Sequence, residues 1–158
     1  MPSSATSASL WEVIAVEAGG ESVLWASALR PPKEREELAV FSALAGERFA
    51  LGLESIYEGY LLHYGRPRLF APPDRDTAIL LGDYLYAHGL VRIAELGDVT
   101  AVGELAELLS VCAHLRAERL PGDGEAWADT VARLGEGRRS EHAEIDRALA
   151  LHAERVDD

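Results

Sequence analysis

Cysteine, proline and long apolar runs are all scarce in this sequence of 158 residues. Cys112 is the single cysteine, which excludes an intramolecular disulfide, and its apolar neighbours favour an inert core position over a catalytic thiol. No window of about 18 apolar residues is free of charge, so no transmembrane segment is expected. The first residues also lack the basic and apolar regions of a signal peptide, and we therefore expect a cytoplasmic protein.

Basic side chains are few as well. Lys and Arg number 15 against 27 Asp and Glu, which gives a formal net charge of -12. An acidic chain repels nucleic-acid phosphates and anionic membranes, so nucleic acid is not an expected partner. The acidic excess is typical of solvated helix faces, and an acidic metal or cation site is the less favoured alternative.

The alternating pattern of a β-strand is missing at useful length, whereas helical periodicity runs through most of the chain. Only 7 prolines interrupt it. The sequence therefore predicts an all-α helix bundle with one helical domain over residues 9–156. A flexible N-terminal tail over residues 1–8 precedes this domain, and a C-terminal helical segment over residues 125–156 completes it.

Capping residues and helix breakers divide the chain into predicted helices. Ser9 can cap a helix that Gly19 and Gly20 end, and a short segment follows it. The next helices are one long amphipathic helix over 33–64, an apolar and therefore central helix that Asp74 or Asp76 caps, a helix from Thr100 to about Arg119, and a last one from about Glu125. Gly135, Glu136 and Gly137 predict a bend in that last segment, whose apolar stripe is Ile145, Leu149, His152 and Val156.

The helix ILLGDYLYAHGLVRIAELGD, from Ile79 to Asp98, resembles the Gly-Asp-Tyr-Leu helix of the trans-isoprenyl (polyprenyl) diphosphate synthase family. In that family a Gly-x-Pro loop precedes the Gly-Asp at a fixed interval, and Gly65-Arg66-Pro67 stands at the matching place. The resemblance covers residues 33–119. It implies a helix bundle resembling a truncated isoprenoid synthase fold.

The resemblance also locates a degenerate first aspartate-rich motif. Glu54 and Glu58 fall on its first and last aspartate positions, Ser55 replaces the second aspartate, and His63 and Tyr64 replace the two diphosphate-binding arginines. Prenyl transfer needs Mg²⁺ held between carboxylates and a diphosphate, with guanidinium groups that neutralise the leaving group. The family's second aspartate-rich motif has no counterpart here, so no catalytic residue and no cofactor are expected.

Some synthases of this family pair a catalytic chain with a small chain that lacks the aspartate motifs. This chain resembles such a small regulatory subunit, which implies a heterodimer with a catalytic prenyl diphosphate synthase and an influence on product chain length. The resemblance is also compatible with a homodimer when the chain is isolated. The likeness implies an interface built around the family-like framework, which consists of Gly65, Arg66, Pro67, Gly82, Asp83, Tyr84 and Leu85.

Two alternatives stay open. The chain can be a divergent Mg²⁺-dependent prenyl transferase that acts alone and holds the ion between Glu54 and Glu58, which lie one turn apart on a helix. It can also be a self-associating helical binding protein for a hydrophobic ligand.

Other candidate residues favour structural roles. No histidine has a glutamate three residues before it, which argues against a di-iron bundle. His142 and Asp146 could form a surface metal site, but ion pairing with nearby arginines explains this charged run more simply. We expect His88 and His114 to be hydrogen-bonded core or interface residues, Phe49 to fill the core, and the three tryptophans to pack outlying helices.

Overall fold

The structure, a computed structural model, describes residues 8–135 and 141–157. In these ranges the chain is helical and has no β-strand, which confirms the all-α prediction. The α-helices are α1 (Leu10–Glu21), α2 (Val23–Ala28), α3 (Glu47–Tyr64), α4 (Arg75–Glu95), α5 (Val99–Ala117), α6 (Asp123–Leu134) and α7 (His142–Arg155). Two 3-10 helices, η1 (Pro32–Glu34) and η2 (Ser42–Leu44), lie before α3.

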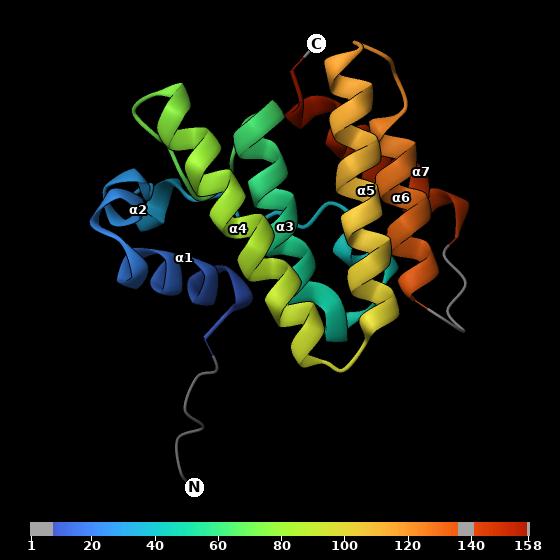
Figure 1. Ribbon diagram of the computed structural model, residues 1–158, viewed down its shortest axis with the longest axis horizontal. Coiled ribbons are helices and arrows are strands. Elements are labelled where there is room, and N and C mark those ends of the chain that lie inside the picture. Colours follow the sequence, from blue (N-terminus) through green and yellow to red (C-terminus); the bar gives the residue numbers. More distant parts are fainter. Residues whose placement is uncertain (1–7, 136–140, 158) are drawn as a thin grey trace, which may run out of the picture.

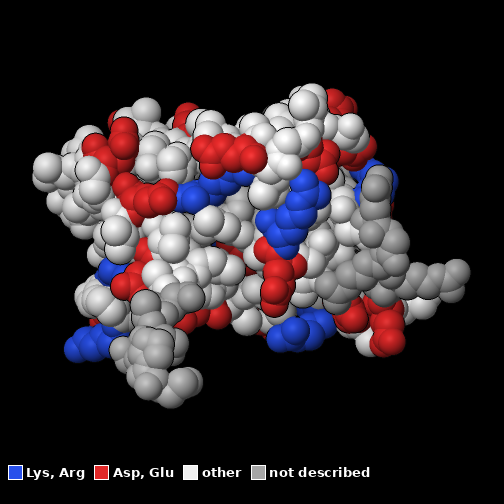
Figure 2. Space-filling model, turned by 90° about the horizontal axis from the view of Figure 1, so that it is seen from below, with Lys and Arg blue, Asp and Glu red and all other residues white. Residues whose placement is uncertain are grey.

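The helices form three groups. Figure 1 shows α3 and α4 in the middle, with α1 and α2 on one side and α5, α6 and α7 on the other. On the face seen in Figure 2, several Lys and Arg side chains lie beside Asp and Glu, with uncharged surface around them. No helix in the described ranges combines the length and apolar character that a membrane crossing requires.

The first two helices follow the predicted caps with one difference. The Ser9 hydroxyl accepts a hydrogen bond from the Glu12 amide and caps α1, as expected. The predicted break at Gly19 and Gly20 is wrong, since α1 continues to Glu21. Ser22 separates the two helices because its hydroxyl caps α2 through the Leu24 amide.

The single long helix predicted over 33–64 is also wrong. Only Glu47–Tyr64 forms an α-helix, and the preceding segment is irregular apart from η1 and η2. Gly46 interrupts the helix with φ 90°, a conformation that favours glycine. Apolar residues of the predicted stripe, including Phe41 and Ala45, are nevertheless buried in the core. Periodicity therefore identified the buried side chains but not the backbone that carries them.

The central helix is α3, and not α4 as the apolar composition of α4 predicted. Every residue from Gly52 to Leu62 is buried. On α4, by contrast, Leu80 is 56% exposed and Val91 is 51% exposed. The helix begins as expected, since the Asp74 carboxylate accepts a hydrogen bond from the Thr77 amide.

Glycines allow α3 and α4 to touch through their backbones. A Cβ added at Gly59 would lie 2.8 Å from the Gly82 carbonyl oxygen, and one added at Gly89 would lie 2.9 Å from the Gly52 carbonyl oxygen. Real Cβ atoms do not approach other atoms this closely. The Gly82 that marks the predicted framework therefore serves helix packing within this chain.

The C-terminal half follows the prediction with shifted boundaries. Asp98, and not Thr100, caps α5. The next helix, α6, begins at Asp123, two residues before the predicted start at Glu125, and Gly122 precedes it with φ 113°. Gly135 ends α6, whereas Glu136 and Gly137 of the predicted bend lie outside the described residues. The predicted stripe of α7 is confirmed, since His152 is buried and Ile145, Leu149 and Val156 pack partly buried on the core.

Two hydrophobic clusters lie on either side of the central helices. The larger one joins α3 to the C-terminal helices and includes Ile56, Tyr60 and Trp127. The smaller one joins α1 and α2 to α4 and includes Trp11 and Phe70. Trp127 is fully buried in the larger cluster, where it packs α6 against α3, so the expected packing role of this tryptophan is confirmed. The predicted core positions of Phe49 and Cys112 are confirmed.

Candidate functional site

Glu54 and Glu58 lie one turn apart on α3, and the structure brings Arg68 between them. The Arg68 Nη1 atom lies 2.9 Å from Glu54 Oε1, and its Nε atom lies 3.0 Å from Glu58 Oε1. None of the three side chains is more than 1% exposed. Arg68 reaches this place because the loop after α3 turns back over the middle of the helix, where the Leu38 carbonyl also accepts a hydrogen bond from Arg68.

The four carboxylate oxygens of this cluster all accept hydrogen bonds. Glu58 Oε1 accepts from the Arg68 amide as well as its Nε, and Glu58 Oε2 accepts from the Leu69 amide at 2.7 Å. Glu54 Oε2 accepts from the Ser42 hydroxyl at 3.0 Å. Burial alone would lower the pKa of Arg68, but the charges of Glu54 and Glu58 outweigh it, so that this pKa is raised. The arginine therefore stays charged at every accessible pH.

This donor set does not fit Mg²⁺. The ion needs several oxygen ligands in octahedral order and usually keeps some of its water. Here a guanidinium occupies the space between the two carboxylates, and their oxygens are committed to protein donors. In the part of the chain that the structure describes, no group of three or more His, Cys, Asp or Glu side chains could hold a metal ion. The geometry supports a buried ion cluster as the role of Glu54 and Glu58.

The remaining positions of the degenerate motif also make contacts within the chain. Ser55 is buried and its hydroxyl donates to the Leu51 carbonyl at 2.8 Å. His63 stacks on Tyr86, with ring centroids 5.0 Å apart, and its Nε2 atom lies 3.0 Å from Asp83 Oδ1. Burial lowers the pKa of His63, although Asp83 opposes this effect. The Tyr64 ring packs against the Tyr60 ring, with their centroids 4.8 Å apart.

The predicted Gly65-Arg66-Pro67 loop binds the C-terminal end of the chain. Gly65 pairs with Val156 in an isolated β-bridge, and its missing side chain permits this contact because a Cβ would lie 2.2 Å from the Arg155 carbonyl oxygen. The Arg66 amide donates to the same carbonyl at 2.8 Å. The Pro67 carbonyl accepts from the Arg30 guanidinium at 3.3 Å. The loop therefore joins segments that are distant in sequence.

The Gly82-Asp83-Tyr84-Leu85 segment of α4 faces mostly inward. Gly82 and Leu85 are buried, whereas the Asp83 side chain is 63% exposed. Tyr84 stacks on His88, with centroids 5.3 Å apart, and approaches Trp25 of α2. Leu80, Ala87 and Val91 are exposed apolar residues of α4 that share one face at helical spacing.

A network that the sequence did not predict joins α3, α5, α6 and α7. The Asp123 carboxylate accepts hydrogen bonds from the Tyr60 hydroxyl at 2.6 Å and from Arg116 at 2.8 Å, and it lies 3.0 Å from His152 Nε2. The other ring nitrogen of His152 lies 2.7 Å from the Tyr57 hydroxyl. Burial would raise the pKa of Asp123, but the hydrogen bonds from His152, Tyr60 and Arg116 lower it well below its usual range.

Signals for these missed residues are weak in the sequence. Arg68 directly follows the Arg66-Pro67 pair, and nothing in its spacing shows that it returns to Glu54 and Glu58. His152 was assigned to a helix stripe and Asp123 to a loop, although they share a carboxylate-imidazole contact. His88 is hydrogen-bonded as expected, since its Nε2 atom lies 2.9 Å from Glu17 Oε2, but it is half-exposed and does not lie in the core, and His114 is exposed.

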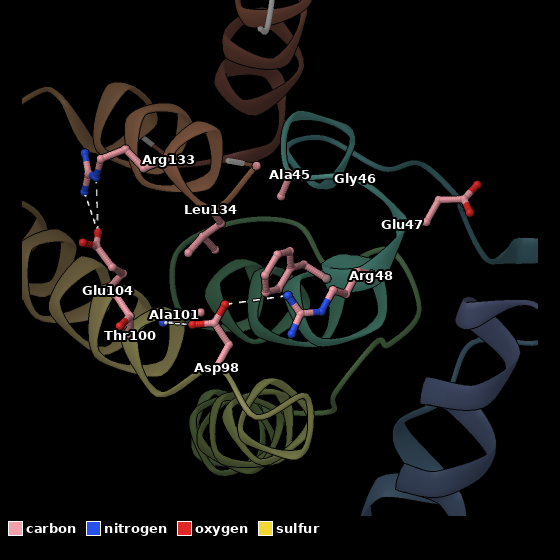
Figure 3. A pocket seen from close by; sticks show the side chains of 12 residues that line it. Ala45, Gly46, Glu47, Arg48, Asp98, Thr100, Ala101, Glu104, Arg133 and Leu134 are labelled. Carbon is pink, nitrogen blue, oxygen red and sulfur yellow. Dashed lines mark hydrogen bonds and ion pairs between the residues drawn. The ribbon is translucent and has the colours of Figure 1, made fainter. Parts of the chain in front are cut away.

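An open cavity of about 850 Å³ lies where α3 and α5 begin and α6 ends. Figure 3 shows Arg48 turned toward Asp98 and Arg133 turned toward Glu104, whereas Glu47 points away. The first pair is 3.8 Å apart and the second is 2.8 Å apart. Each arginine among the described residues that line this cavity therefore has an acidic partner.

The chain matches no family model, no curated protein and no solved structure in the three comparisons made.

Proposed function

We propose that this chain is a non-catalytic subunit that associates with a catalytic trans-prenyl diphosphate synthase and influences the length of its product. The Glu54–Arg68–Glu58 cluster is the observation that carries this proposal. The two carboxylates stand where the resemblance expects Mg²⁺ ligands, yet a buried arginine pairs with both of them. A bundle with this arrangement lacks the means to ionise an allylic diphosphate, because neither a metal cage nor free guanidinium groups face that place.

The interior also supports a role without chemistry. Between α3, α6 and α7 the rings of Phe41, Tyr57, Tyr60 and Trp127 pack against one another at centroid distances of 5.1 to 6.4 Å. A growing prenyl chain would need an open channel, and close-packed aromatic rings fill this space instead.

The outer face of α4 supplies the contact surface in this proposal. Leu80 and Val91 are both more than half exposed, and Ala87 lies exposed between them on the same face. A row of exposed apolar side chains on one helix suits burial against another protein. Because α4 is held to α3 by backbone contact, this face is presented on a rigid support.

Co-expression with the trans-prenyl diphosphate synthases encoded in the same genome tests the proposal. We expect one of them to co-purify with this chain, and the complex to give products of different length from the catalytic chain alone. Replacing Leu80 and Val91 by Asp should abolish the complex without unfolding the chain. Val23→Asp, at an 83% exposed valine on α2, is the matched control and should leave the complex intact.

Two results would contradict the proposal. One is Mg²⁺-dependent turnover of an allylic diphosphate by the purified chain without a second protein. The other is the absence of any co-purifying synthase when both chains are folded and abundant.

A further inference from the structure

A second cavity, of about 380 Å³, lies at the end of the bundle where α3 and α5 finish and α4 begins. This is the upper end of the molecule in Figure 1, close to the C-terminus. The residues that line it are His63, Tyr64, Arg75, Ala113, Arg116, Ala117, Arg119 and Asp157. Three of them are arginines and one is a histidine, against a single carboxylate. In a chain with a net charge of -12, this is a local reversal of sign.

The arginines differ in how they are held. Arg116 is fixed from behind, since it donates to the Asp123 carboxylate at 2.8 Å and to the Asp157 backbone carbonyl at 2.7 Å. Its side chain remains 19% exposed, and it lies over the Tyr64 ring. Arg75 makes only a long contact, 3.4 Å, with the His63 carbonyl. Neither Arg75 nor Arg119 has an acidic partner within 8–135 and 141–157, unlike the paired arginines of the larger cavity.

Helix electrostatics do not account for this group. Arginines at the end of α5 suit the negative end of a helix dipole, which explains Arg116 and Arg119. Arg75 is the first residue of α4, where the dipole disfavours a cation. Arg119 has φ 54°, the single positive φ of a non-glycine residue among those described, because it lies in the C-terminal cap of α5, where the Leu120 amide donates to the Leu115 carbonyl at 2.8 Å. Arg75 and Arg119 therefore lack an acidic partner among the described residues, whereas Arg116 is paired with Asp123.

We propose that this cavity binds a phosphate-bearing anion, with Arg75 and Arg119 as its main ligands. Arg116, which its own hydrogen bonds hold in place, lines the cavity beside them. Guanidinium groups bind phosphate oxygens through paired hydrogen bonds, and the half-buried Tyr64 lines the same cavity. The volume accommodates one phosphate or a diphosphate. The site is distinct from the Glu54–Arg68–Glu58 cluster and involves no metal ion, so it does not depend on the proposed partner.

Calorimetric titration of the purified chain with inorganic phosphate and with inorganic diphosphate tests the site. The buffer contains 150 mM NaCl as competing salt and a chelator. We expect saturable binding at one site. The anion with the higher affinity identifies whether the site is built for one phosphate or for a diphosphate. Replacing Arg75 and Arg119 together by Ser should weaken this binding at least tenfold, on the order expected for two lost charged hydrogen bonds.

A matched control removes the same charge elsewhere. Arg48→Ser combined with Arg133→Ser takes two arginines from the larger cavity and should leave anion affinity unchanged within about twofold, since those charges are distant and screened. Asp157→Asn removes the one carboxylate of the lining and should strengthen binding several-fold. Absence of saturable binding, equal weakening by both arginine pairs, or equal affinity for sulfate and diphosphate would overturn the proposal.

Discussion

Arg68 donates hydrogen bonds to Glu54 and Glu58 although none of its own surface reaches water. Removing one partner from such a cluster leaves uncompensated charge in the interior, which costs far more than the cluster itself contributes. The exposed pair between Arg133 and Glu104 is its natural comparison, because water already solvates both groups.

We expect Arg68→Met to lower the free energy of unfolding by about 3–5 kcal/mol, because two buried carboxylates would share no counter-charge. Arg133→Met, with its side chain 59% exposed, should cost less than about 1 kcal/mol. Urea unfolding followed by circular dichroism measures both. Equal losses for the two variants would show that Arg68 is not an essential part of the core.

Asp123 gives the protein a defined acid sensitivity. Its folded pKa is depressed below the ordinary value of 3.8, so the stability it contributes is complete above that value and is lost as the pH falls through the folded pKa. The unfolding midpoint in urea should therefore decrease below about pH 4. Asp123→Asn should be less stable at neutral pH and should show a shallower decrease in the acid range. Parallel curves for the two proteins would contradict this assignment.

Cys112 provides a probe of folding. Burial raises the pKa of its thiol to about 12, so the thiolate is scarce at neutral pH and the sulfur is out of reach of reagents. A thiol-specific reagent at pH 8 should leave the folded protein unmodified and should label one thiol per chain in urea. Rapid labelling without denaturant would mean that α5 opens readily.

At the scale of elements, the sequence predicted the presence of the helices far better than it predicted how they pack together. Caps at Ser9 and Asp74 and breaks at proline and glycine placed most helices within a few residues. The prediction of one long helix over 33–64 was wrong because the backbone of its first part makes hydrogen bonds to a distant loop. The Glu36 amide, for example, donates to the Arg68 carbonyl. Local periodicity contains no information on such contacts, and for the same reason Arg68 was missed as the partner of Glu54 and Glu58.

The crossing of α3 and α4 makes a prediction at this scale. Gly59→Ala would place a methyl group against the Gly82 carbonyl and should destabilise the protein by about 1–3 kcal/mol through overpacking. Gly103→Ala on α5 has no atom within 4 Å of its added Cβ and should instead stabilise by up to about 1 kcal/mol through helix propensity. Thermal unfolding of both variants checks the sign of each change, and a neutral Gly59→Ala would contradict the close approach.

For the whole molecule, charge is the dominant property that remains after local pairing. Many arginines have acidic neighbours, yet the chain retains a net charge of -12, and the repulsion of this excess acts against the compact state. The melting temperature should therefore rise as the NaCl concentration increases from 10 to 200 mM. The Debye length is about 8–10 Å near physiological salt, so repulsion between more distant charges is largely screened there. A falling melting temperature would indicate that attractive surface pairs outweigh the excess.

The meeting of the Gly65 loop with residues 155–157 has a consequence for synthesis on the ribosome. The Tyr64 carbonyl obtains its hydrogen-bond donor from the Asp157 amide, and Arg66 obtains its acceptor from Arg155. A nascent chain can assemble the α3–α4 pair long before these partners leave the exit tunnel. The loop must therefore stay exposed until residues 155–157 have been synthesised, and a premature stop codon within α7 would leave it permanently open to proteases.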